Sequence, residues 1–118
     1  MTYSSAELKQ KYARLLSRKE LFFTKEYYSI NDFAMDLGTN RSYASRFVNT
    51  ELGVTFPTLI KKLRLAHFLK LRKESPEQTI TALLKQCGFC NAFTFRRQFK
   101  AEYGMTPSEM CKENKYDD

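Results

Sequence analysis

Hydrophobic residues recur about every three to four positions along most of the chain, which is the spacing of amphipathic α-helices. The alternation of apolar and polar residues that would indicate β-strands is missing from the sequence. Short polar or glycine-containing segments separate the helical stretches. The pattern therefore predicts an all-α fold of about seven helices.

Capping residues mark where these helices should begin. Ser, Thr or Asn precedes most of the apolar stretches, and Gly follows several of them. Ser4 with Glu7, and Ser29 with Asp32, have the spacing of a capping box, and Thr39 or Asn40 is expected to cap the third helix. The first helix should turn one apolar face inward, formed by Leu8, Tyr12, Leu15 and Leu16.

Two parts of the chain repeat at an offset of 50 or 51 residues. The matching pairs are Ile30 and Ile80, Gly38 and Gly88, Arg46 and Arg97, Gly53 and Gly104, and Thr55 and Thr106. Each copy contains a cap, a short helix, a glycine turn, a second helix and a closing glycine, which is the outline of a helix-turn-helix.

The repeat predicts a domain organisation. A helix and a boundary segment are expected over 1–28, and a domain that contains both helix-turn-helix units is expected over 29–118. Within that domain we expect one helix-turn-helix over 29–53, a long linker helix over 56–73, a second helix-turn-helix over 79–104, and a C-terminal helix over 107–114.

The second helix of each unit shows a face that can enter a major groove. In the first unit that face holds Ser42, Ser45, Arg46 and Asn49, while Ala44, Phe47, Val48 and Leu52 point inward. An arginine can pair with both major-groove acceptors of guanine, and short serines let the backbone approach the bases. A solvated polar face without a ligand has the same pattern, so the first unit alone does not decide between the two.

The second unit repeats this division. Its outward face holds Phe93, Arg96, Arg97 and Lys100, and its inward face holds Ala92, Phe95, Phe99 and Tyr103. An outward Phe among three cations can touch a thymine methyl group, or it can fold back onto the preceding helix as ordinary packing. Both interpretations of Phe93 stay open at this point.

Charge adds to this picture. Twenty Lys and Arg residues face 13 acidic ones in a chain of 118 residues, which gives a formal charge of +7 and favours a polyanionic partner, nucleic acid before membrane. Further cations on the linker helix either flank the phosphate backbone or are solvated: Lys61, Lys62, Arg64, Lys70, Arg72 and Lys73. No apolar run is long enough for a membrane span, and no signal peptide follows Met1, so we expect a cytoplasmic protein.

Parts of the sequence are also compatible with two other functional classes, an enzyme and a protein-interaction domain. Cys87 and Cys90 form a CxxC motif that could serve a thiol oxidoreductase, but this motif normally follows a strand, whereas here it follows a helix. Cys111 and the single His67 add too few zinc ligands, and their spacing does not match a zinc site. We therefore expect no enzyme activity, no metal and no cofactor. A helical protein-interaction domain would not concentrate Arg and Lys on both outward faces.

The segment CGFCNAFTFRRQFKAEYGMTPSEM, Cys87–Met110, resembles the second helix-turn-helix signature of the AraC/XylS-type bacterial transcription regulators. The matching positions are Gly88-Phe89, Phe95, Phe99-Lys100, Gly104 and Thr106-Pro107. The segment INDFAMDLGTNRSYASRFVNTELGVTF is similar to the first unit of the family, and Arg64 matches a usual arginine of the linker helix. The resemblance covers about Ser29 to Glu113.

The resemblance implies two recognition helices that enter successive major-groove segments on one face of the duplex. The base-reading candidates that it implies are Ser42, Ser45, Arg46, Ala92, Phe93 and Arg97. It implies phosphate contacts near Asn40 and Asn91, and the remaining phosphate or flanking candidates are Arg41, Asn49, Arg96 and Lys100.

Some positions depart from the family pattern. Ala44 stands where Leu is usual, Phe68 and Leu84 where small residues are usual, Cys87 in place of Val, and Phe93 in place of a small polar residue. The implied partners are double-stranded DNA, RNA polymerase, and an N-terminal sensor or dimerisation domain that this sequence does not contain. The chain is then either a minimal regulator or, as we expect, the C-terminal piece of a longer one.

Overall fold

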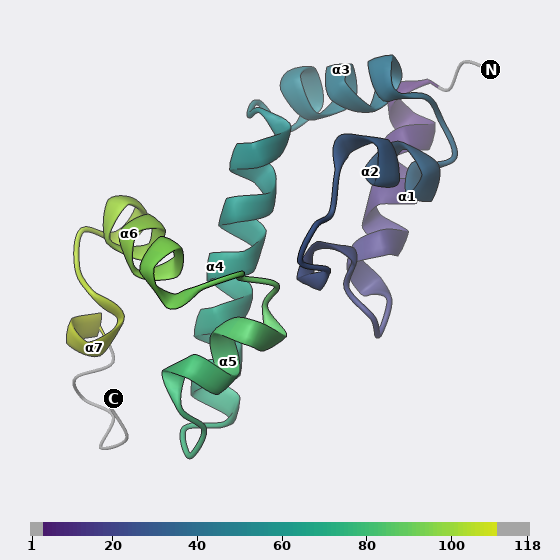
Figure 1. Ribbon diagram of the computed structural model, residues 1–118. Helices are drawn as coiled ribbons and strands as arrows, with labels where there is room; N and C mark the ends of the chain where they lie inside the picture. Colours follow the sequence, from purple (N-terminus) through teal and green to yellow (C-terminus); the bar gives the residue numbers. More distant parts are fainter. Residues whose placement is uncertain (1–3, 111–118) are drawn as a thin grey trace. The chain divides into compact units, whose positions relative to one another are not determined.

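The computed structural model describes residues 4–110, and all regular structure among them is helical, as predicted (Figure 1). The elements are α1 (Ser5–Ser17), the 3-10 helix η1 (Phe22–Thr24), α2 (Ile30–Leu37), α3 (Arg41–Glu51), α4 (Phe56–Glu74), α5 (Ile80–Gln86), α6 (Ala92–Tyr103) and α7 (Pro107–Met110). The predicted continuation of the last helix to residue 114 lies outside the described residues.

The chain folds as two compact units, Met1–Ile60 and Lys61–Asp118. The first unit contains the α2–α3 helix pair and the second contains the α5–α6 pair. Helix α4 contributes its first residues to one unit and the remainder to the other.

Local capping explains where the helices begin. The side chains of Ser4, Ser29, Asn40, Thr79 and Asn91 each accept a hydrogen bond from a backbone N–H in the first turn of the following helix. Ser4, Ser29 and Asn40 are capping positions expected from the sequence, and Asn40 rather than Thr39 caps α3. Gly38, which ends α2, has a φ of 74°, a left-handed conformation that glycine adopts without steric cost.

The first unit has an aromatic core to which the N-terminal helix contributes. The ring of Tyr12 in α1 lies 6.1 Å from that of Phe33 in α2 and 5.7 Å from that of Phe47 in α3. Phe22 of η1 lies 5.6 Å from Phe33. The sequence did not predict η1, because three residues are too short to show a helical period.

One inward residue of α1 was predicted wrongly. Leu8 and Leu15 are buried, but Leu16 is 38% exposed. Leu16 follows Leu15 by 100° around the helix axis, which carries it to the edge of the apolar face rather than its centre.

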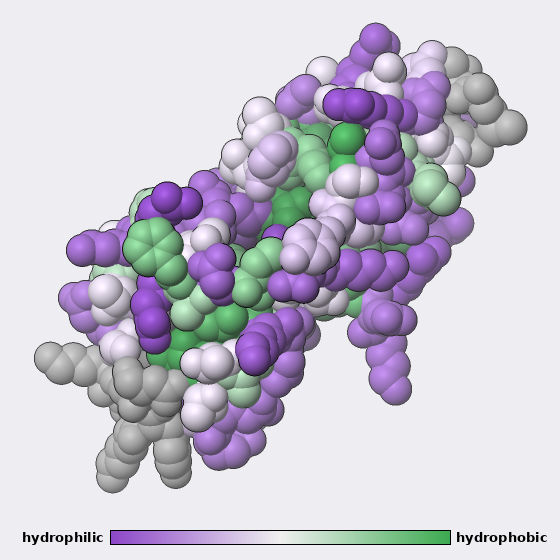
Figure 2. Space-filling view, viewed as in Figure 1, coloured by the Kyte–Doolittle hydropathy of each residue, from purple (hydrophilic) through white to green (hydrophobic). Residues whose placement is uncertain are grey.

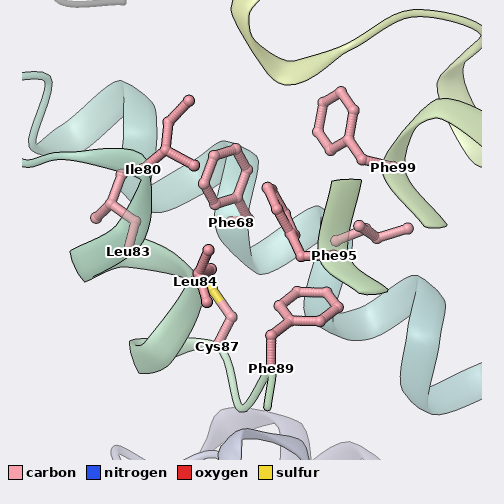
Figure 3. Close-up of a cluster of buried hydrophobic side chains, with 9 residues drawn as sticks. Phe68, Ile80, Leu83, Leu84, Cys87, Phe89, Phe95 and Phe99 are labelled. Atoms are coloured by element: carbon pink, nitrogen blue, oxygen red, sulfur yellow. The ribbon is translucent and has the colours of Figure 1, made fainter. Parts of the chain in front are cut away.

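The second unit is built around three phenylalanines whose rings contact one another at a tilt or edge-on (Figure 3). Phe68 of α4 lies 4.7 Å from Phe95 of α6 and 5.9 Å from Phe99, measured between ring centroids. Phe89 approaches Phe95 to 4.9 Å from the turn before α6. The remaining buried members of this cluster are Leu65, Ile80, Leu83, Leu84 and Cys87. The face of α6 that bears Phe95 and Phe99 is therefore fixed toward the core.

Arg72, which the sequence placed among the solvated or phosphate-flanking cations of α4, is only 2% exposed. One of its terminal nitrogens donates to the carbonyl of Gln78 at 2.8 Å. The charged guanidinium is therefore stabilised by a hydrogen bond within the protein, and this bond orders the turn between α4 and α5. Positive charge in the sequence predicts exposure. The prediction fails here because the backbone carbonyls of Pro76 and Gln78 accept hydrogen bonds from the guanidinium.

No helix among the described residues is long and apolar enough to cross a membrane.

Candidate nucleic-acid interface

Helix α3 has one buried and one exposed face. Ala44, Phe47 and Val48 are buried against the rest of the first unit. The opposite face carries exposed Ser42, Arg46 and Asn49. Because the buried face fixes the rotation of the helix, these polar side chains are held toward solvent together, as the sequence predicted.

These residues border a shallow hollow on α3. It is lined by Arg41, Ser42, Ser45, Arg46, Asn49 and Thr50. Ser45 is half-buried, and the hydroxyl of Thr50 donates to the carbonyl of Arg46 at 2.7 Å. Thr50 was not a sequence candidate, although it lies four residues after Arg46 and so shares its face.

Arg46 is also held from one side by an aromatic ring. Its guanidinium carbon lies 5.7 Å from the ring centroid of half-buried Tyr43, within cation–π range. Sequence reasoning did not identify this contact. The spacing of three residues on a helix would have suggested it.

Helix α6 shows the same division. Phe95 and Phe99 are fully buried, whereas Arg96, Arg97 and Lys100 are exposed. Figure 2 shows hydrophilic residues over much of one face of the molecule, with apolar ones between them. Phe93 is 74% exposed, so it does not fold back onto the preceding helix as ordinary packing would require.

Ala92, the remaining base-reading candidate of α6, lies on the side of the core. It is partly buried and packs against the second unit's hydrophobic cluster. Ala92 was carried over from the family by its position, and its base-reading role stays a prediction.

Asn40 and Asn91 are both exposed and each caps one of these helices. The Oδ1 atom of Asn40 accepts from the N–H of Tyr43 at 2.9 Å, and that of Asn91 accepts from the N–H of Thr94 at 2.7 Å. Neither helix has an acidic residue in its first turn. Helix N-termini carry partial positive charge and unpaired N–H groups, so both ends are suited to an anion such as phosphate.

The acidic residues of the two helices sit at the far end of each. Glu51 of α3 lies 3.4 Å from the ammonium of Lys9, and Glu102 of α6 lies 3.8 Å from that of Lys62. These exposed ion pairs contribute little to stability, on the order of 0–1 kcal/mol. They do offset the negative charges of Glu51 in α3 and Glu102 in α6, and they show that Lys62 has an acidic neighbour within its own unit.

Cys87 and Cys90 of the CxxC motif are not joined in a disulfide, and their surroundings do not favour disulfide exchange. Cys87 is buried, and burial raises the pKa of its thiol to about 12, so it is protonated at neutral pH. The thiolate is the reactive form in disulfide exchange, and Cys87 lacks it. Cys90 is exposed at the surface, and Cys111 lies outside the described residues. Among residues 4–110 no group of His, Cys, Asp and Glu is arranged to hold a metal ion.

Comparison with known proteins supports the helix-turn-helix arrangement. A helix-turn-helix domain family matches residues 33–113. The Msm operon regulatory protein of Streptococcus mutans is 27% identical over 84 residues, which are 71% of this chain and 30% of that protein. The chain thus spans less than a third of the length of this relative.

A solved structure of a Listeria innocua protein of unknown function has the same fold. It superposes with a TM-score of 0.70 at 18% sequence identity and covers 92% of this chain and 97% of its own.

Proposed function

The chain belongs to the AraC-type helix-turn-helix family of DNA-binding transcription regulators, and we propose that it binds double-stranded DNA sequence-specifically through α3 and α6. Each helix would enter a major groove with its exposed face, and the two would read successive segments of one duplex.

The observation that carries this proposal is the paired exposure of Arg46 and Arg97. They stand at the same position of the two repeats, each on a helix whose opposite face is buried in its own unit. A guanidinium fork matches the O6 and N7 acceptors of guanine, so each arginine can read one guanine. Ser42 and Ser45 in the first unit, and Ala92 and Phe93 in the second, complete the proposed base-reading sets.

The flanking polar residues would position the helices rather than read sequence. Asn40 and Asn91 stand at the positive ends of α3 and α6, where a phosphate oxygen is stabilised. The other proposed phosphate or flanking contacts are Arg41, Asn49, Arg96 and Lys100. Contacts to phosphate fix the register of a protein on the duplex but carry no base information.

The name of the Streptococcus mutans relative describes an operon regulatory protein, which supports a role in transcription control. From the family resemblance we further propose that the chain acts together with RNA polymerase. A sensor or dimerisation domain elsewhere in a longer protein is part of the same proposal.

Selection of binding sites from random duplexes tests the proposal directly. We expect an enriched site with two conserved segments about one helical turn apart, because both helices must reach the same face of the duplex. With about six phosphate contacts, the logarithm of affinity should fall with the logarithm of salt concentration with a slope of about −5.

The control variant is Arg14→Ala, which removes one exposed positive charge from α1 and leaves both recognition helices intact. It should keep the enriched site unchanged. Selection that enriches no sequence would contradict the proposal, and an affinity independent of salt would contradict its phosphate contacts.

A further inference from the structure

Phe93 occupies the first turn of α6 with most of its ring in solvent. A single exposed apolar side chain is ordinary on a protein surface and needs no explanation by itself. What distinguishes Phe93 is its neighbours, because Arg96, Arg97 and Lys100 are exposed on the same helix. An apolar ring among these cations offers a nucleic acid one contact that is neither charged nor a hydrogen bond.

The ring of Phe93 is in contact range of one of these cations. The guanidinium carbon of Arg97 lies 5.8 Å from its centroid, which is within the range of a cation–π interaction. A planar guanidinium held against a ring keeps N–H donors in its own plane for other partners. Phe93 therefore restricts the directions that Arg97 can take without using up its hydrogen-bonding capacity.

The two side chains can reach adjacent bases. Residues four apart lie one above the other on a helix, and the first turn of a recognition helix is the part that meets base edges. In the major groove guanine presents two acceptors, and thymine alone presents a methyl group. Arg97 has the donors for the first and Phe93 the apolar surface for the second.

We propose that Phe93 and Arg97 act as one reading unit for a guanine beside a thymine. Arg97 donates to O6 and N7 of the guanine, and the Phe93 ring covers the C5 methyl group of the neighbouring thymine. This rests on the proposed function, since it requires α6 to lie in a major groove.

The first unit provides an internal comparison. The offset of 51 residues places Arg46 opposite Arg97, but it places Ser42 opposite Phe93. The ring beside Arg46 is the half-buried Tyr43, three residues earlier. Helix α3 therefore has a hydroxyl at the position where α6 has an exposed ring, and dependence on a thymine methyl should be confined to the half-site bound by the second unit.

The experiment replaces each thymine of the selected site, one at a time, by deoxyuridine, which removes only the methyl group. The half-site of the second unit is the one whose base preference is relaxed by Arg97→Ala. We expect one replacement there to weaken binding of the full chain about fourfold. This loss of affinity corresponds to the free energy of transferring one methyl group out of water. Replacements in the other half-site should have no effect of this size.

Phe93→Ala completes the test. This variant should bind the thymine duplex about fourfold more weakly than the unaltered chain and should bind thymine and deoxyuridine duplexes equally. Because Phe93 is exposed, its replacement should leave the helical circular dichroism signal intact.

Three outcomes would overturn the inference. One is a deoxyuridine effect of the same size in Phe93→Ala, which would assign the methyl contact to another residue. Another is a selected site that tolerates every deoxyuridine in the second half-site. In both of these cases specific DNA binding itself persists, so the proposed function stands. Failure to distinguish the selected site from random duplex would refute the proposed function and this inference with it.

Discussion

The cap of α6 allows stability and DNA affinity to be changed separately. Asn91 accepts the N–H of Thr94 through Oδ1 at 2.7 Å, and its side chain is exposed where we propose a phosphate contact. The perturbation is Asn91→Asp, compared with Asn91→Ala. Aspartate keeps the capping oxygen but loses the amide donor and adds a negative charge.

The stability of the two variants should differ in a defined way. Asn91→Ala removes the capping hydrogen bond, so the free energy of unfolding should fall by about 1 kcal/mol. Asn91→Asp retains the cap and places a negative charge at the positive end of α6, which favours the folded state by roughly 0.3–1 kcal/mol. Urea unfolding followed by circular dichroism measures both values.

DNA affinity should follow a different order from stability. Asn91→Asp loses a hydrogen bond to a charged group, worth about 1.5–3 kcal/mol, and gains repulsion from the phosphate. We expect affinity for selected and random duplexes alike to fall at least about tenfold, because a phosphate contact carries no base information. Fluorescence anisotropy with labelled duplexes is the assay.

The matched control is Asn31→Asp, the same chemical change at an exposed position in the first turn of α2. It should leave affinity close to that of the unaltered chain. Wild-type affinity in Asn91→Asp would refute the phosphate contact, and a loss confined to the selected duplex would show that Asn91 contacts a base instead.

Three further predictions concern other parts of the molecule. Arg46→Ala and Arg97→Ala should each cost about 1–3 kcal/mol of specific binding and relax base preference in one half-site only, as measured by competition with single-base variants of the selected duplex. As a comparison, Lys62→Ala should weaken the binding of all duplexes equally or not at all. If the two arginine variants also lost affinity equally on all duplexes, the arginines would contact phosphates rather than bases. Cys87→Val should leave DNA binding unchanged with or without reductant, because the buried thiol has a pKa of about 12 and stays protonated. If reductant changed the DNA affinity of the unaltered chain but not of this variant, Cys87 would have a redox role. Phe95→Ala should lower the free energy of unfolding of the second unit by about 3–5 kcal/mol in urea unfolding, since its ring contacts Phe residues from three segments. A loss below about 1 kcal/mol would mean that neighbouring side chains repack into the cavity.

The helix starts were predictable because a cap is a local interaction. The Ser29 side chain accepts from the N–H of Asp32 only three residues away, and the Asp32 carboxylate accepts from the Ser29 N–H in return. Such a pair is visible in the sequence without knowledge of the fold. The same holds for the outward faces of α3 and α6, which follow from helical periodicity alone.

The positions that sequence reasoning missed depend on contacts between distant segments. The fold brings Tyr12 against Phe33 and Phe47, and no local pattern indicates which aromatic residues will meet. Arg72 is buried with a terminal nitrogen hydrogen-bonded to carbonyls of the following turn, which its charge does not suggest. The orientation of Phe93 stayed open for the same reason, since either a core or a solvent position was compatible with its place in the helix.

The contribution of α1 to the first aromatic core determines how much of the chain must be transplanted together. The family match begins at Phe33, yet the rings that cover Phe33 and Phe47 come from Tyr12 and Phe22. A graft cut at the family boundary would present these faces to water and would lose the apolar burial that orients α3. The smallest portable DNA-binding module therefore has to include α1 from Ser4 onward, and fusion joints in chimaeric regulators are better placed before that helix than after it.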